Sequence, residues 1–427
     1  MNYESQLKKR LLLFTSANGI AQLAVIAASP LLTRVYSSTA FGNGSAFVAA
    51  VMILVPLATL RYDFAIPVPE EDEDAAQLLF VSALVSVLYF FLLLLLSRIF
   101  PWSLLEFEYA QDIKNNTGLI CLGVLALGLN TTFNAWIMRI RQVKNASKAR
   151  IVSVVCLLST QLFLGYFVSS SGASIIMGFV AGQLAGLAYL IFPVFKSLKT
   201  LRAKPSILKM KQISKKYKDY PLISCPGSLV NIVTLNIQPI FIAATFGASI
   251  AGQYSLARLV LQQPVNILSQ SISQVYYREA ADLYKSNPRQ LHSLFLKLSL
   301  LLITLTGAGF LVTPFFNTLF PLIFGGEWSL AGDYAKIVYI MAATCLVSNS
   351  LSALPAMGFN KTQGVWEIVR MVSVVLLFKY ALDDQITPGH LVYLLVGFMA
   401  IFYVFNWLLN FSVIRREYRK SGVPKLQ

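Results

Sequence analysis

Residues Gly252–Tyr277 read GQYSLARLVLQQPVNILSQSISQVYY, a 26-residue run that carries one formally charged side chain, Arg258. About 20 predominantly apolar residues suffice for a helix to cross the hydrocarbon core of a bilayer, which is roughly 30 Å thick. The whole chain has this character, because 56% of its 427 residues are hydrophobic and 13% are charged. Soluble domains carry about 25% charged residues, and membrane β-barrel strands are near ten residues long and alternate in polarity. The sequence therefore predicts an all-α polytopic membrane protein.

Twelve apolar runs recur along the chain, and each predicts one membrane-spanning helix. They are centred near Ala21, Val51, Leu84, Leu125, Leu158, Ala181, Val233, Ile267, Ile303, Ala342, Val374 and Val396. An even number of spans places both termini on the same side of the membrane.

Lysine and arginine are distributed unequally between the two predicted sides. With cytoplasmic termini, 28 of the 35 basic residues fall on the cytoplasmic side, five on the other side and two, Arg258 and Arg370, within spans. The positive-inside rule favours this orientation. Topology thus accounts for the net charge of +16, and nucleic acid is not expected as a partner.

The two halves of the chain resemble each other. Phe41–Ser45 at the start of the second span matches Ala251–Ser255 at the start of the eighth, at an offset of 210 residues. Six spans per half mean that the two copies run in the same orientation, which predicts two pseudo-symmetric lobes. We expect an N-terminal lobe over residues 1–195, a basic cytoplasmic linker over 196–220 and a C-terminal lobe over 221–427. The linker is either a plain solvated segment or, in part, an amphipathic helix on the inner leaflet.

Polar side chains form stripes on three of the predicted spans. Successive helical residues lie about 100° apart, so the members of each stripe share one face. The stripes comprise Thr15, Asn18, Gln22, Ser29 and Thr33 in span one, Ser224, Ser228, Asn231, Thr234 and Gln238 in span seven, and Ser255, Arg258, Gln262, Asn266, Ser269 and Ser273 in span eight. One stripe alone is more often a packing contact between helices. Three together favour a water-filled cavity between two lobes.

Arg258 is the charged member of the span-eight stripe. An arginine at the centre of a spanning helix costs about 2.5 to 3.5 kcal/mol on insertion scales, so it usually faces a cavity or a partner. The alternative is that its side chain snorkels to the outer interface. No carboxylate in the apolar interior of a span is an obvious partner, and an anionic ligand is therefore the natural candidate. Three further candidates for anion contacts, or else interfacial anchors, are Arg34 at the outer end of span one, Arg61 at the inner end of span two and Arg278 below span eight.

Several local motifs resemble a known family. They are Pro30–Tyr36 (PLLTRVY), Phe41-Gly42, Leu60–Ile66 (LRYDFAI) with Pro69 and a following acidic run, Tyr217–Pro221 (YKDYP), Cys225-Pro226 and Ala251–Pro264. Together these residues resemble the polysaccharide flippase family, the O-antigen translocases of the multidrug/oligosaccharidyl-lipid/polysaccharide exporter superfamily. The resemblance spans the whole chain.

The resemblance implies two six-helix lobes around a central cationic cavity lined chiefly by spans one, two, seven and eight. It further implies translocation of undecaprenyl-pyrophosphate-linked oligosaccharide from the cytoplasmic to the periplasmic leaflet of a bacterial inner membrane. Related flippases often carry a cavity arginine at the position of Arg258. Span two has little polar character beyond Ser45 and Thr59, which leaves its share of the cavity in question.

The expected substrate contacts combine the arginines with amide side chains that can bond sugar hydroxyls. They are Arg258, Asn18, Gln22, Arg34, Arg61, Asn231, Gln262 and Asn266. We expect no cofactor, no metal and no catalytic residue. The expected partners are the lipid-linked oligosaccharide, membrane lipids, and the glycan polymerase and glycosyltransferases of the same pathway.

Two other functions are weighed against this one. A small-molecule exporter of the same superfamily is expected to need a more apolar cavity and a titratable carboxylate within the membrane. A glycan polymerase needs a large outer loop or clustered acids. The longest outer loop, about residues 97–116, has little room for an active site, and His292 and His390 are isolated. The acidic run Glu70–Asp74 either gates the inner mouth or, more simply, caps the following helix as a solvated turn.

Overall fold

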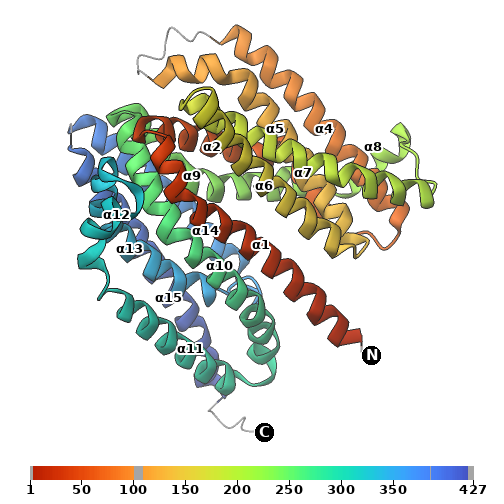
Figure 1. Cartoon of the computed structure of the whole chain (residues 1–427). Helices are drawn as coiled ribbons and strands as arrows, with labels where there is room; N and C mark the ends of the chain where they lie inside the picture. Colours follow the sequence, from red (N-terminus) through yellow and green to blue (C-terminus); the bar gives the residue numbers. More distant parts are fainter. Residues whose placement is uncertain (1–2, 101–108, 385, 422–427) are drawn as a thin grey trace. The chain divides into compact units, whose positions relative to one another are not determined.

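The computed structural model describes the backbone of residues 3–100, 109–384 and 386–421, and the side chains of residues 19–100, 114–384 and 386–420. All regular elements in these ranges are helical, which confirms the predicted fold class (Figure 1). Part of the predicted outer loop, residues 101–108, lies outside the described residues. The chain forms two compact units, Met1–Gly252 and Gln253–Gln427. The predicted lobe and linker boundaries remain predictions.

Each of the twelve predicted runs lies in a helix. The helices of the first unit are α1 (Tyr3–Val35), α2 (Ser38–Thr59), α3 (Tyr62–Ala65), α4 (Asp72–Ile99), α5 (Tyr109–Arg139), α6 (Val143–Phe167), α7 (Gly172–Thr200), α8 (Ile207–Lys216), the π-helix η2 (Tyr220–Ser224) and α9 (Cys225–Phe246). Helix α10 (Ala248–Ser286) begins in the first unit and continues into the second. The second unit then holds α11 (Pro288–Gly309), α12 (Phe316–Phe324), α13 (Ser329–Ser350), α14 (Asn360–Asp383) and α15 (Pro388–Ser421).

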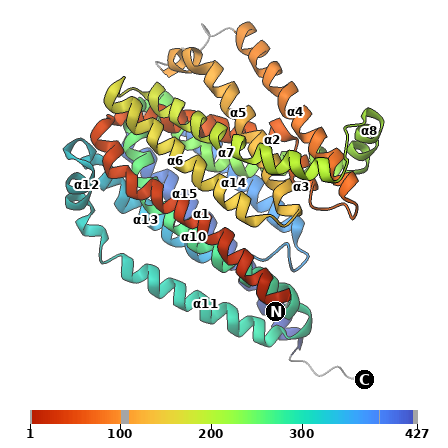
Figure 2. The same ribbon diagram turned by 45° about the vertical axis from the view of Figure 1, so that its right-hand side comes forward.

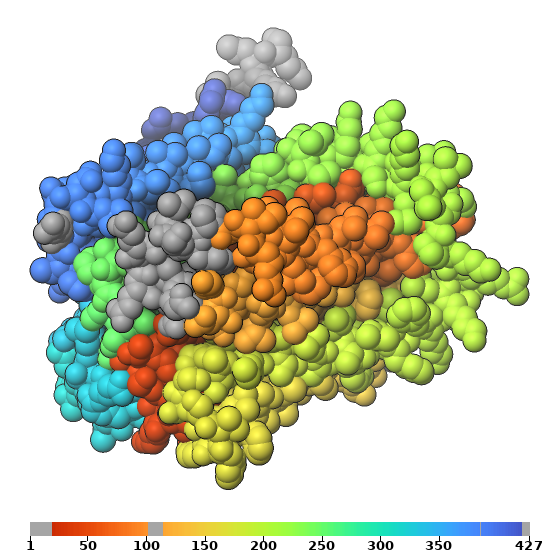
Figure 3. All heavy atoms as spheres, turned by 90° about the horizontal axis from the view of Figure 1, so that it is seen from above, coloured from red at the N-terminus to blue at the C-terminus, as the bar shows by residue number. Residues whose placement is uncertain are grey.

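Nine helical segments of the described residues are long and apolar enough to cross a membrane. The three predicted spans outside this set are α1, of which Gly19–Val35 is the shorter apolar part, and α10 and α14. Helix α4 has the highest hydropathy of the nine and is only 28% buried, as expected of a helix that faces lipid. Its surface is visible along its length in Figure 3.

Helix α2 lies at the centre of the first unit and packs against α4, α5, α7 and α9. Valine, isoleucine and phenylalanine side chains dominate this core, where Phe47 meets Phe179 edge to face with ring centroids 6.3 Å apart. Ser37 caps the start of α2 by accepting a hydrogen bond from the backbone N–H of Ala40.

Aromatic stacking holds much of the second unit. Phe295 of α11 stacks on Trp407 and Phe411 of α15, with centroids 5.6 and 6.0 Å apart. The indole N–H of Trp407 donates to the hydroxyl of Ser299 on α11. These contacts tie α11 to α15, which also packs against α13 and α14.

Within the predicted basic linker, the chain forms helix α8, which lies beside the start of α4 (Figures 1 and 2). Lys209 and Lys216 of α8 form ion pairs with Glu73 and Asp74 in the first turn of α4. Ile213 is buried while Ile207 and Leu208 are exposed. The helical alternative for this segment is thus the one that the structure adopts.

The glycines of the predicted repeat meet each other. A Cβ atom on Gly42 would lie against the backbone oxygen of Ala248, and a Cβ atom on Gly252 would lie against the backbone oxygen of Ser38. Both distances would be under 3.0 Å, which real Cβ atoms essentially never show. Ser38 and Ala248 are themselves offset by 210 residues, like Gly42 and Gly252. The contact is therefore reciprocal, as a local two-fold relation between the starts of α2 and α10 requires. The hydroxyls of Ser38 and Ser249 are hydrogen-bonded at 2.7 Å at the same crossing.

Candidate functional site

Arg258, Gln262 and Asn266 lie on one face of α10, as the stripe predicts. Arg258 is partly buried, and its guanidinium lies over the ring of Tyr254, 5.8 Å from the centroid. The amide nitrogen of Gln262 donates to Asn266 Oδ1 at 3.3 Å and to Cys345 Sγ on α13 at 3.2 Å. The Oε1 atom of Gln262 is buried and accepts no hydrogen bond from the described part of the chain. This face of α10 thus offers a cation and amide groups inside the second unit.

A second arginine, Arg370 of α14, belongs to the same interior. Its side chain is only 3% exposed, and its guanidinium lies over Trp366 at 4.4 Å. Both Arg258 and Arg370 are within electrostatic range of Cys345 and Tyr403. The second unit thus brings two guanidinium groups into one interior, and guanidinium is the side chain best matched to phosphate oxygens. The sequence placed Arg370 within a span but gave it no role, because no polar stripe surrounds it.

Amides and hydroxyls extend this polar interior across three helices. Asn349 donates to Cys345 Sγ, and Asn406 of α15 donates to Ser348 Oγ on α13 at 3.1 Å. Asn410 Oδ1 accepts from the backbone N–H of Ala353. Such groups can exchange their hydrogen bonds with sugar hydroxyls. Among the residues with described side chains, no group of three or more His, Cys, Asp or Glu could hold a metal ion.

In the first unit, Arg61 lies in a strained turn between α2 and α3. Leu60 and Arg61 both adopt positive φ angles, 46° and 59°, which for non-glycine residues costs about 1 to 3 kcal/mol each and is typical of functional sites. The Arg61 guanidinium lies 4.5 Å over the Phe64 ring, and its buried Nε has no hydrogen-bond partner among the residues with described side chains. The turn therefore holds a partly desolvated cation at one end of α2.

Asp63 lies beside Arg61 in the same turn and is only 5% exposed. Burial raises the pKa of the Asp63 carboxyl above its ordinary value, while the Thr59 hydroxyl and the Arg61 charge oppose that rise. Burial lowers the pKa of the Arg61 guanidinium, and Asp63 opposes the fall. Sequence reasoning assigned Asp63 only to the end of a span, and its burial depends on tertiary packing that no local pattern reveals.

The other predicted contacts in the first unit are dispersed. Gln22 of α1 is partly buried, and no residue that the structure describes forms a hydrogen bond with its Oε1 atom. Arg34 is exposed and donates to the backbone oxygen of Pro30 on its own helix. Asn231 is partly buried on α9, and the side chain of Asn18 lies outside the described residues. Helix α2 separates Arg34 from Arg61. Its 22 residues span about 33 Å at 1.5 Å per residue, so the two side chains cannot hold one phosphate together.

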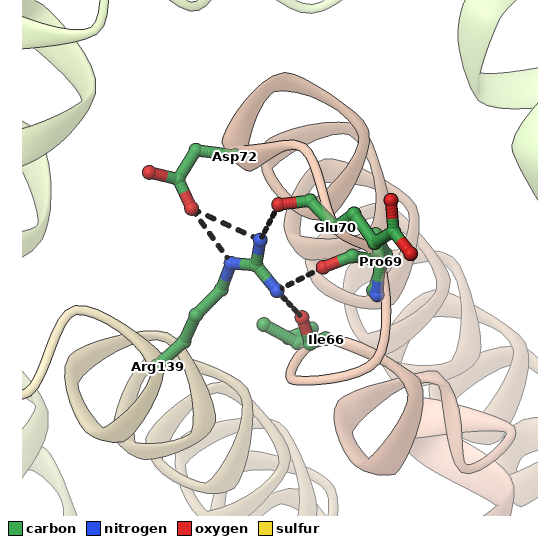
Figure 4. Close-up of polar contacts among 5 residues, drawn as sticks. All are labelled: Ile66, Pro69, Glu70, Asp72 and Arg139. Atoms are coloured by element: carbon green, nitrogen blue, oxygen red, sulfur yellow. Dashed lines mark hydrogen bonds and ion pairs between the residues drawn. The ribbon is translucent and has the colours of Figure 1, made fainter.

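Arg139, the last residue of α5, holds the loop between α3 and α4. Its guanidinium donates to the backbone oxygens of Ile66, Pro69 and Glu70 at 3.2, 2.8 and 3.3 Å and pairs with Asp72 at 3.0 Å (Figure 4). Asp72, Glu73 and Asp74 occupy the first turn of α4, where carboxylates favour the helix dipole. The acidic run thus lies at the N-terminus of α4, where no side chain forms a cap hydrogen bond, and its carboxylates form ion pairs with Arg139 and with lysines of α8. A role of the run at the inner mouth remains a prediction.

Replacing Arg139 by alanine is expected to loosen this loop. The change leaves three carbonyls and one carboxylate without their donor, and hydrogen bonds that involve a charged group contribute about 1.5 to 3 kcal/mol each. A glutamate-specific protease should cut after Glu70 or Glu71 several times faster than in the unsubstituted protein. Lys144→Ala, an exposed position at the start of α6, is the control. Equal cleavage rates in both variants would contradict the conclusion that Arg139 holds this loop.

The sequence matches the profile of one known protein family. The profile of the family described as "Polysaccharide biosynthesis protein" matches residues 31–332, more than two thirds of the sequence. No curated protein sequence matches the chain significantly.

Solved structures share its fold. The structure described as lipid II flippase MurJ in an inward closed conformation matches with a TM-score of 0.71 at 11% identity, covering 96% of this chain and 91% of the other. An inward-facing multidrug resistance MATE family transporter of the MOP superfamily matches with a TM-score of 0.61 at 12% identity, covering 95% and 100%. A MOP superfamily transporter from Pyrococcus furiosus, whose description reports a binding pocket of reverse polarity, matches at 0.57 and 12%, covering 97% of both.

Proposed function

This chain belongs to the polysaccharide biosynthesis protein family, and on that premise we propose that it is a flippase for lipid-linked oligosaccharide. The cargo is an oligosaccharide on undecaprenyl pyrophosphate, an O-antigen or related surface-polysaccharide repeat unit. It moves from the cytoplasmic to the periplasmic leaflet of the bacterial inner membrane. The chain carries out no bond chemistry in this role, and both of its termini face the cytoplasm.

The two guanidinium groups in the interior of the second unit, those of Arg258 and Arg370, are the observation that carries this proposal. A flippase must accommodate a pyrophosphate and sugars across hydrocarbon while the polyprenyl tail stays in lipid. Arg258 and Arg370 supply the charge for the pyrophosphate, and Gln262 and Asn266 supply hydrogen bonds for sugars. In the first unit, Arg61, Arg34, Gln22, Asn18 and Asn231 are the proposed contacts along the path.

Membrane potential supplies part of the driving force in this mechanism. Outward movement of an anion from a negative cytoplasm is downhill by about 2.3 kcal/mol per elementary charge per 100 mV. The guanidinium groups of the second unit lower the energy barrier for moving the same anion across the membrane. This effect does not reduce the membrane potential.

Export of a small molecule is the second candidate, because MATE-type transporters share the fold. A cationic drug would meet two guanidinium groups in the second unit, and like charges in an interior of low dielectric repel strongly. The structure therefore favours an anionic cargo over a cationic one.

Deleting the gene tests the proposal in cells. We expect the host to lose its surface polysaccharide and to accumulate full-length lipid-linked oligosaccharide that stays inaccessible from the periplasm. Re-expression of the chain should reverse both effects. Accumulation of shortened oligosaccharide instead would indicate a glycosyltransfer defect and would contradict a flippase.

A further inference from the structure

A cavity of about 860 Å³ opens on the first unit, apart from the polar faces described above. It lies between the last turns of α7 and the connection from α5 to α6, with Asp72 at the start of α4 on its rim. Ala188 and Phe192 form an apolar wall, whereas Gln142, Asn145 and Lys196 form a polar one. The cavity thus joins an apolar surface to a polar one.

The floor of the cavity is held rigidly. Ser197 lines it, donates to the backbone oxygen of Val194 and accepts from the indole N–H of the fully buried Trp136, each at 2.7 Å. Because Trp136 is part of the core cluster at this end of the unit, the cavity wall is built by the fold and not by a surface loop alone.

The charge around the cavity is positive. Lys196 is exposed and forms no ion pair with any residue that the structure describes. Asp72, the one acidic lining residue, is paired with Arg139. Asn145 donates to Gln142 Oε1 at 2.8 Å, which leaves the NH₂ group of Gln142 to donate to a ligand. An ammonium and an amide donor that line the same cavity suit a phosphate diester.

The position of the cavity indicates where that phosphate comes from. Helix α7 is a candidate span. Residues of its last three turns line the cavity, at the end of the helix that the basic residues predict to be cytoplasmic. Phe192 is 74% exposed on this surface, as expected beside acyl chains. Basic cavities at the cytoplasmic ends of membrane helices bind anionic headgroups.

We propose that this cavity binds an anionic phospholipid of the cytoplasmic leaflet. Its phosphate lies against Lys196 and Gln142, and an acyl chain runs along Ala188 and Phe192. The site is separate from the proposed transport path, so the proposal does not depend on the flippase function.

Lipid binding to the purified, delipidated full-length protein tests the site. Native mass spectrometry in neutral detergent should show phosphatidylglycerol retained in preference to phosphatidylcholine. Lys196→Gln should weaken retention of phosphatidylglycerol about fivefold, since a lysine at a membrane surface contributes about that much toward anionic lipid. Lys199→Gln, an exposed position on the same helix outside the cavity lining, should retain the lipid as the unsubstituted protein does.

A second pair of variants tests the cavity itself without changing charge. Ala188→Phe fills the apolar wall and should also reduce retention, whereas Leu184→Phe, one turn earlier on α7 and outside the lining, should not. Equal retention of the two lipids, or equal behaviour within both variant pairs, would overturn the proposal. Displacement of the lipid by the same concentration of inorganic phosphate would also overturn it, because the site would then be one for free phosphate.

Discussion

Replacing Gly252 by valine is expected to lower the stability of the protein and its yield in the membrane. A Cβ atom at this position would overlap the backbone oxygen of Ser38 on α2. Both groups belong to helix backbones, so relief requires α2 and α10 to separate rather than one side chain to rotate. Overpacking of a fitted core costs about 1 to 3 kcal/mol, and a backbone contact falls at the upper end of that range. Gly42→Val should behave alike, because its contact with Ala248 is the reciprocal one.

Gly227→Val on α9 is the matched control, since a Cβ atom there meets no atom within 4 Å. Protein yield and the midpoint of thermal unfolding in detergent measure the effect. Near-normal yield and stability of both Gly252→Val and Gly42→Val would show that α2 and α10 do not cross at these glycines.

Replacing Arg258 by alanine should reduce surface-polysaccharide export at least about tenfold at normal protein level, because a charge-assisted contact of about 1.5 to 3 kcal/mol with the pyrophosphate is lost. Arg258→Lys should keep part of the activity, since it preserves the charge but not the planar, bidentate geometry. Arg258 also lies over the buried ring of Tyr254, and a desolvated cation–π contact contributes about 2 kcal/mol, so folding stability is measured in both variants alongside export.

Arg98→Gln provides the control for charge removal, since Arg98 is an exposed residue in the last turn of α4. Export and protein level are measured together in cells that lack the native gene. Unchanged export in both Arg258→Ala and Arg258→Lys would exclude Arg258 from the transport path.

The fold could be predicted well because a membrane constrains the sequence strongly. Each spanning helix must satisfy its backbone hydrogen bonds internally, so a long apolar run has one structural outcome. Of the three spans with polar stripes, α9 is long and apolar enough to cross a membrane by composition alone, whereas α10 was predicted as a span although it falls outside that set. The short helices α3 and α12 were not predicted, because four and nine residues are too few for a periodic pattern to stand out.

The candidate site could be predicted only where its residues share one helix face. The 100° spacing grouped Arg258, Gln262 and Asn266 because all three lie on α10. Arg370 joins them from another helix, through packing around Cys345 and Tyr403 that sequence spacing does not encode. The burial of Asp63 escaped prediction for the same reason.

Flipping by the purified protein tests the account most directly. The protein is reconstituted into vesicles with fluorescently labelled undecaprenyl-pyrophosphate oligosaccharide on both leaflets, and a membrane-impermeant reductant is added outside. With the unsubstituted protein we predict that nearly all of the label is quenched, whereas protein-free vesicles stop at the outer-leaflet half and vesicles with the Arg258→Ala variant approach completion far more slowly. Quenching that stops at half with correctly folded, unsubstituted protein would contradict the proposed function.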